Sequence, residues 1–263
     1  MTNSRRQLQM NYRAATAAQV CVPKPFERFA LWFAARLLQT LVARRQPIEL
    51  RSVVARMFSK LALLPHGYAQ AAPVFAAHTQ LRLATVEHEL DRLLDGRLVF
   101  ESTETWHRAY QEVLDGVQVR RYLSVALIKS DDYWHDTPSE CSLQFNATMV
   151  QHGFLVHRVF IIDEFFWPRH CREPNLHLLH WMSLQKQAGL DVSLIRREDL
   201  AHEPHLVGDF GIYGDDAVGY QETDFEGRTV RYELRFDAAS LRRAEQHWRE
   251  LLLYAKPWRD LFS

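Results

Sequence analysis

Side chains with binding chemistry gather on and just after two apolar segments, 120–128 and 156–162. Arg158 lies in the apolar run Val156–Ile162, and a buried cation needs an anionic partner. Asp209, before a Gly-Asp-Asp turn, is the expected partner. We predict an aromatic-lined site for a small ligand with polar groups, with a buried structural ion pair as the alternative. The site would be formed by Tyr122, Ser124, Asp131, Tyr133, Trp134, Arg158, Asp209 and Tyr213.

Other catalytic and metal-binding patterns are missing from the sequence. It has 13 histidines but no HExxH motif, and the His177/His180 pair has no nearby acid on its helix face. It also lacks a phosphate-binding loop, a dinucleotide fingerprint and a GxSxG elbow. Nothing favours Cys141 or Cys171 as a nucleophile over a buried structural role. We therefore predict no catalytic residue, no metal and no cofactor.

The stretch from Val207 to Tyr220 predicts two short strands joined by a tight turn. Gly214 tolerates the positive φ that such a turn can need. Three further glycines, Gly208, Gly211 and Gly219, leave the strand backbone without side chains. A bare strand backbone usually marks a bulge or the close approach of another group.

From residue 96 onward, the rest of the chain alternates between strand and helix patterns. Strands are predicted at 98–100, 120–128, 156–162, 190–195 and 229–236, with a final helix that begins at Asp237. This order predicts an α/β fold: a mostly parallel sheet with an antiparallel end and helices on both faces. Ligands of such sheets bind beyond the carboxyl ends of the strands, which here lead into loops 129–138, 163–175 and 196–206.

The first part of the chain is helical and basic. Residues 1–60 hold eleven Lys/Arg against two acids, which leaves 21 (32 − 11) against 30 (32 − 2) in residues 61–263. The excess positive charge predicts contact with a polyanion, either nucleic acid or an anionic membrane surface, through Arg44, Arg45 and Arg51. The alternative, which we favour slightly, is that this charge is matched by the acidic remainder of the same chain. We predict two parts of the chain: a basic, mainly helical N-terminal region, 1–95, and an α/β domain, 96–263.

Three scattered cysteines fit a reducing cytoplasm. Residues 29–35 form the most apolar run, which is too short to span a bilayer. An apolar N-terminal face formed by Phe26, Phe29, Phe33 and Leu37 predicts a partner surface, in a homodimer or with another protein.

The order of elements from about 97 to 256 resembles one half of a phospholipase D-like fold. The resemblance lies in Arg-Tyr-Leu-Ser-Val-Ala-Leu, Val-His-Arg-Val-Phe-Ile-Ile, Gln-Ala-Gly-Leu-Asp-Val and the Asp-Phe-Gly-Ile-Tyr-Gly-Asp hairpin. Active members carry a His and a Lys two residues apart on the strand that enters this hairpin. The matching strand here, Gly208–Gly211, has neither, so the imidazole nucleophile and the phosphate-holding cation are missing. The resemblance also implies pairing of two halves, hence a homodimer.

Three functions follow as expectations. The first is a non-catalytic phospholipase D-like protein that acts as a ligand-sensing or partner-binding regulatory module. The second is a hydrolase or phosphodiesterase with a rearranged active site. The third is a nucleic-acid-binding protein that uses the basic N-terminal helices.

Overall fold

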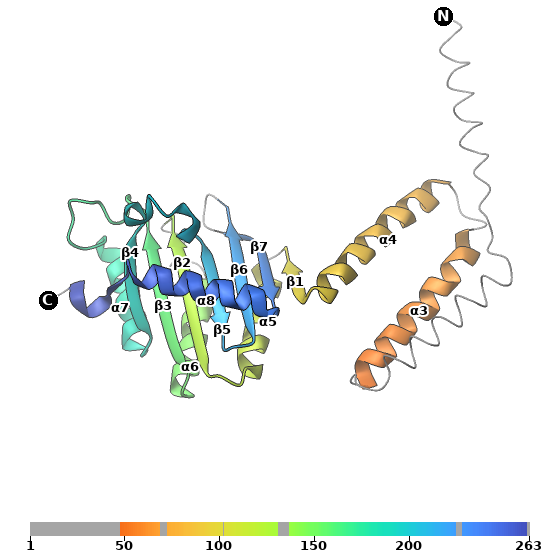
Figure 1. Cartoon of the computed structure of the whole chain (residues 1–263), viewed down its shortest axis with the longest axis horizontal. Helices are drawn as coiled ribbons and strands as arrows, with labels where there is room; N and C mark the ends of the chain where they lie inside the picture. Colours follow the sequence, from red (N-terminus) through yellow and green to blue (C-terminus); the bar gives the residue numbers. More distant parts are fainter. Residues whose placement is uncertain (1–47, 69–72, 102, 131–136, 225–227, 262–263) are drawn as a thin grey trace, which may run out of the picture. The chain divides into compact units, whose positions relative to one another are not determined.

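The computed structural model describes residues 48–68, 73–101, 103–130, 137–224 and 228–261. The chain divides into two compact units, Met1–Leu83 and Ala84–Ser263, and each is described by itself (Figure 1). The apolar N-terminal face around Phe29, together with Arg44 and Arg45, lies outside the described residues.

Two long helices precede the α/β domain. Helix α3 spans Ile48–Tyr68 and helix α4 spans Pro73–Leu94. Pro73 is tolerated at the first helical position because the amide hydrogen that it lacks would have no partner inside the helix there. None of the residues of α4 is buried. The apolar side chains of this helix are therefore open to a partner.

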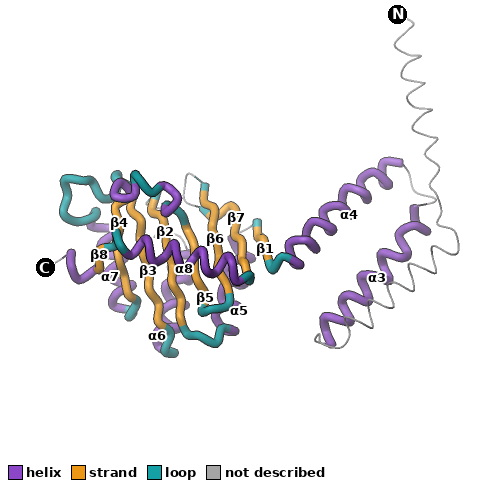
Figure 2. Tube along the Cα trace, in the orientation of Figure 1, coloured by secondary structure: helices purple, strands orange, loops and turns teal. Residues whose placement is uncertain are grey.

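One sheet of eight strands organises the domain (Figure 2). Its strand order is β1-β7-β6-β5-β2-β3-β4-β8. The strands are β1 (Arg97–Phe100), β2 (Arg121–Ile128), β3 (Leu155–Ile162), β4 (Asp191–Arg196), β5 (Asp209–Tyr213), β6 (Ala217–Thr223), β7 (Thr229–Arg235) and β8 (Lys256–Pro257).

The sheet is mixed, and its parallel part is smaller than the sequence led us to expect. Within the described residues, only β2 with β3 and β3 with β4 pair in parallel. The other five neighbouring pairs are antiparallel. Few residues separate β5 from β6 and β6 from β7, and a connection of so few residues can only link antiparallel neighbours. The antiparallel end therefore extends over half of the sheet.

Helices cover both faces of the sheet, as predicted. One face packs against α5 (Thr103–Gly116), α6 (Thr137–Gln151) and α7 (Leu176–Gln187), and α8 (Ala238–Leu252) crosses the other (Figure 1). Single 3₁₀ turns follow β4 (Arg197–Leu200), precede β5 (Pro204–Leu206) and end the domain (Trp258–Leu261). Alternate residues of β2 and β3 enter separate apolar clusters on the two faces, because successive side chains of a strand point to opposite sides.

Candidate functional site

A cluster of tyrosines fills the sheet face beneath α5 and α6. The rings of Tyr122 and Tyr213 stack with centroids 5.2 Å apart and planes 13° apart. The Tyr213 and Tyr232 hydroxyls share a hydrogen bond of 2.6 Å, and Tyr110 of α5 lies 6.2 Å from the Tyr122 ring. All four side chains are buried. Burial raises the pKa of Tyr213 and Tyr232 well above the ordinary value, so both phenols stay neutral.

Two paired glycines make room for these rings. Gly211 and Gly219 are direct partners across β5 and β6. A Cβ atom on Gly219 would lie 2.1 Å from the Tyr232 hydroxyl oxygen, and one on Gly211 would lie 2.9 Å from that of Tyr213. The close approach predicted at these glycines is therefore an approach by the protein's own tyrosines. Gly214 has φ +55° in the turn, as predicted.

Arg158 does not pair with Asp209, so the predicted ion pair is wrong. Arg158 is only 5% exposed and its Nη1 donates to Oε1 of Gln185 on α7 at 3.0 Å. The register explains the mismatch. Arg158 lies opposite Ser124 on β2, which in turn lies opposite Gly211 on β5. Strand β2 therefore separates Arg158 from β5, and Asp209 lies two residues before Gly211, at the start of β5. Residue spacing within one strand does not reveal which strands are neighbours or this offset between them.

Asp209 instead caps the end of β2. Its Oδ1 accepts a 2.6 Å hydrogen bond from the backbone N–H of Leu127. Burial raises the pKa of the Asp209 carboxyl to about 6, although the Leu127 N–H and the Lys129 ammonium both pull it down. Desolvation thus outweighs a hydrogen bond and a nearby cation. The carboxyl changes its charge close to neutral pH.

Polar side chains surround Asp209 where β2 ends. Lys129 Nζ donates to Oγ1 of Thr223 at 2.9 Å, and Gln221, the β6 partner of Asp209, donates to Oγ1 of Thr229 at 2.5 Å. We call these five residues the Asp209 cluster. They lie at the carboxyl end of a central strand, where sheets of this class bind ligands.

The structure separates the predicted site residues into groups. Tyr122, Ser124, Arg158 and Tyr213 share one buried face of the sheet, whereas Asp209 belongs to the cluster at the end of β2. The remaining predicted members, Asp131, Tyr133 and Trp134, lie outside the described residues. They directly follow Lys129 and Ser130 in sequence.

Sequence reasoning missed several residues around these groups. Lys129 was expected only as the start of a loop, and Gln221 and Thr223 lie beyond the hairpin predicted at Val207–Tyr220, although β6 extends to Thr223. Gln185 follows Trp181 by four residues on the apolar stripe of α7, and this spacing is a signal of burial. Tyr110 likewise lies on the apolar stripe of α5.

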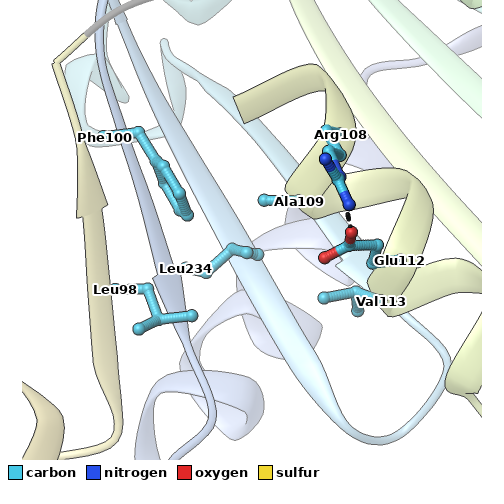
Figure 3. Close-up of a pocket in the computed structure, with 7 residues that line it drawn as sticks. All are labelled: Leu98, Phe100, Arg108, Ala109, Glu112, Val113 and Leu234. Atoms are coloured by element: carbon cyan, nitrogen blue, oxygen red, sulfur yellow. Dashed lines mark hydrogen bonds and ion pairs between the residues drawn. The ribbon is translucent and has the colours of Figure 1, made fainter. Parts of the chain in front are cut away.

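A separate hollow opens at the β1 edge of the sheet (Figure 3). It encloses about 400 Å³, and its walls come from β1, β7 and α5. Arg108 and Glu112 face each other on the α5 side in a 2.8 Å ion pair. None of the predicted site residues lines this hollow, and its apolar walls are Leu98, Phe100, Ala109, Val113 and Leu234.

The histidines do not form a metal centre in the part of the chain that the structure describes. No group of three or more His, Cys, Asp or Glu side chains there could hold a metal ion. His205 lies between Glu203 and Glu250, with N···O distances of 3.5 and 3.6 Å. Across the same residues, no helix combines the length and the apolar character that crossing a membrane requires. The backbone of Arg51 lies in α3.

Comparisons with known proteins find likeness in fold. No protein-family model matches the chain, and no curated protein matches its sequence. Among solved structures, Nuc, a phospholipase D family member from Salmonella typhimurium, matches with 9% identity and a TM-score of 0.43 over 62% of this chain and 98% of its own. NucT from Helicobacter pylori matches with 12% identity and a TM-score of 0.38 over the same shares.

A third solved structure matches a larger share of this chain. TrmBL2, an archaeal chromatin protein, matches at 12% identity and a TM-score of 0.40, covering 77% of this chain and 69% of its own. These solved structures, one of them a phospholipase D family member by name, are what the chain is similar to, and the phospholipase D-like fold stays an expectation from the sequence. At such identities the likeness concerns the arrangement of elements and does not extend to activity.

Proposed function

We propose that this protein is a non-catalytic regulatory module that senses a small polar ligand at the Asp209 cluster. The observation that carries the proposal is a desolvated carboxyl, with a pKa raised to about 6, at the carboxyl end of β2. The same cluster contains an ammonium, two hydroxyls and an amide, which form two hydrogen bonds with one another. Such a set offers both donors and acceptors to a ligand.

The residues on strand β5 support a binding role over a catalytic one. Gly208, Asp209, Phe210 and Gly211 stand where active phospholipase D-like proteins carry a histidine and a lysine. Strand β5 contains neither a histidine that could act as the nucleophile nor a lysine that could hold the phosphate. The glycines at 211 and 219 are used to pack tyrosines, so this part of the hairpin serves the core.

A ligand screen against matched variants tests the proposal. Thermal unfolding of the full chain is measured with neutral polyols, sugars, amino acids and nucleosides as probes. Asp209→Asn keeps an oxygen for the Leu127 N–H and removes the charge, while Asp224→Asn alters another acid of the same sheet end. We expect at least one probe class to stabilise the wild type and Asp224→Asn but not Asp209→Asn. Equal responses in all three proteins would refute the assignment of the ligand to the Asp209 cluster.

The second candidate is a hydrolase or phosphodiesterase with a rearranged site. One observation favours it: a carboxyl with a pKa near neutral suits general acid–base catalysis. A chromogenic phosphodiester is the test substrate. Turnover that survives repurification and is lost in Asp209→Asn would replace the sensing proposal with this one. We expect none.

We also propose that the module is a homodimer, joined through α4. Leu83, Val86, Leu90 and Leu93 recur at the spacing of a coiled-coil seam, and the last three are 41%, 41% and 54% exposed. Arg82 and Glu87 flank this seam and carry opposite charges. In a parallel pair of helices, they would meet the Glu87 and Arg82 of the second copy.

Light scattering of seam variants tests the dimer. Leu90→Glu places a charge on the seam, and Leu81→Glu places the same charge on a side chain that is 66% exposed and off the seam. We expect a dimer for the wild type and Leu81→Glu and a monomer for Leu90→Glu. A wild-type monomer at micromolar concentration, or a dimer in all three, would contradict the interface. We further propose a cytoplasmic location, which suits the free thiols of Cys141 and Cys171.

A further inference from the structure

Among the residues that the structure describes, Arg158 is a buried cation without an anionic partner. It is 5% exposed, and its strand neighbours in register are Ser124 on β2 and Val192 on β4. Its guanidinium carbon lies 6.0 Å from the centroid of the Phe160 ring. Burial of an unpaired charge costs several kcal/mol. Some other group must offset that cost, or the arginine would favour unfolding.

The described side chains that contact Arg158 are neutral. Among the described residues no carboxylate pairs with Arg158, whose one hydrogen bond goes to the neutral Oε1 of Gln185. Tyr110 is close enough to interact with the guanidinium electrostatically, but burial raises its pKa far above neutral. Tyr110 therefore stays a neutral phenol and cannot balance the charge.

Two neighbouring buried donors lack acceptors within the described part of the chain. There, neither the Nε of Arg158 nor the Nε2 of Gln185 has a hydrogen-bond partner, and Gln185 is fully buried. Because Oε1 of Gln185 accepts from Arg158, the free end of this amide is its NH₂ group. Both unsatisfied atoms therefore require an acceptor, and the net charge beside them is positive.

We propose that Arg158 and Gln185 bind a small anion between β3 and α7. The ligand is a monovalent inorganic anion of the size of chloride or the carboxylate group of a small molecule. A carboxylate suits the planar guanidinium fork, which binds it through parallel hydrogen bonds. A water molecule would satisfy the two donors but would leave the charge unbalanced. This site is distinct from the Asp209 cluster and does not depend on the function proposed for it.

Anion exchange at constant ionic strength tests the proposal. Thermal unfolding of the full chain is followed while gluconate, which is too bulky for a closed site, is replaced by chloride or formate. Ligand linkage predicts that, above the dissociation constant, each tenfold rise in the bound anion raises Tm by about 3–5 °C. A response to formate alone identifies a carboxylate site, and a response to both identifies a site for small anions in general.

Three variants separate the site from general salt effects. Arg158→Met removes the cation and should abolish the anion response. Gln185→Glu places a carboxylate beside Arg158, so it should also abolish the response, with a Tm in gluconate at or above that of the wild type. Arg196→Met is the control, because Arg196 stacks over Trp167 with its guanidinium carbon 4.4 Å from the ring centroid; it should keep the response.

Two results would overturn the site. One is a wild-type Tm that is the same in gluconate, chloride and formate. The other is an anion response that persists unchanged in Gln185→Glu, which also decides the matter if Arg158→Met does not fold.

Discussion

Replacing Gly219 with alanine tests how the hairpin and the tyrosine cluster fit together. The new Cβ would lie 2.1 Å from the hydroxyl oxygen of Tyr232 and 2.7 Å from its Cζ, so the ring must move. Tyr232 is 2% exposed, and Phe100 lies beside it with ring centroids 6.2 Å apart. The ring therefore cannot leave its place without disturbing the core.

The expected loss of stability has two sources. Overpacking of a filled core costs about 1–3 kcal/mol. Loss of the buried hydrogen bond between the Tyr213 and Tyr232 hydroxyls, 2.6 Å long, adds about 0.5–1.5 kcal/mol. The sum, about 1.5–4.5 kcal/mol, lowers Tm by about 3–18 °C for a domain of this size.

Urea unfolding followed by tryptophan fluorescence, at one protein concentration, measures this loss. Gly208→Ala is the matched control, because a Cβ there meets nothing within 4 Å, and it should change the free energy of unfolding by about 0.5 kcal/mol or less. In the Tyr232→Phe background, where the clashing oxygen is gone, Gly219→Ala should cost less than it does in the wild type. A loss in Gly219→Ala no larger than that in Gly208→Ala would refute the packing argument.

Three further predictions concern charge and capping. The pKa of Asp209 is raised from 3.8 to about 6 in the folded state, so the native protein binds the proton more tightly. Stability should then fall by up to about 3 kcal/mol as the pH rises from about 4 to 6, relative to Asp209→Asn, in urea titrations across that range. Burial lowers the pKa of His157, which bonds to Ser193 at 3.0 Å and contacts the Trp248 ring edge-on at 5.0 Å. Its contribution should therefore be lost as the pH falls below about 6.5, and His157→Gln should unfold at a midpoint that depends less on pH between 7.5 and 5.5. Asp237 accepts a 2.7 Å hydrogen bond from the Ser240 N–H at the start of α8; Asp237→Ala should cost about 1 kcal/mol and Asp237→Asn only a few tenths, and equal losses in calorimetry would exclude a capping role.

Local chemistry made several elements readable from the sequence. The final helix was expected to begin at Asp237, and the side chain of Asp237 accepts a hydrogen bond from the first turn of α8. Gly214 was expected at a tight turn, and its φ is +55°. These features depend on interactions between residues a few positions apart. A single stretch of chain therefore contains all the information that they need.

The sequence predicted a close approach to the glycines of the hairpin, but it did not predict which side chains approach them. A bare strand indicates that something approaches closely. Only the folded sheet shows that the neighbours of Gly211 and Gly219 are the tyrosines at 122, 213 and 232, which come from three different strands. The sequence pattern of each strand does not indicate which strands lie side by side in the sheet.

The hydrogen-bond partner of Arg158 is a second feature that the sequence could predict only in part. Alternation along β3 establishes that Arg158 and its neighbours Phe160 and Ile162 point to one face, since the side-chain period of a strand is two. Register and strand order decide the rest. They place Arg158 level with Gly211 and bring it to Gln185, and they leave Asp209 two residues away at the end of β2. Pairing between strands is a contact between distant parts of the chain, so residue spacing could predict the buried face and only the tertiary structure could determine which side chains meet on it.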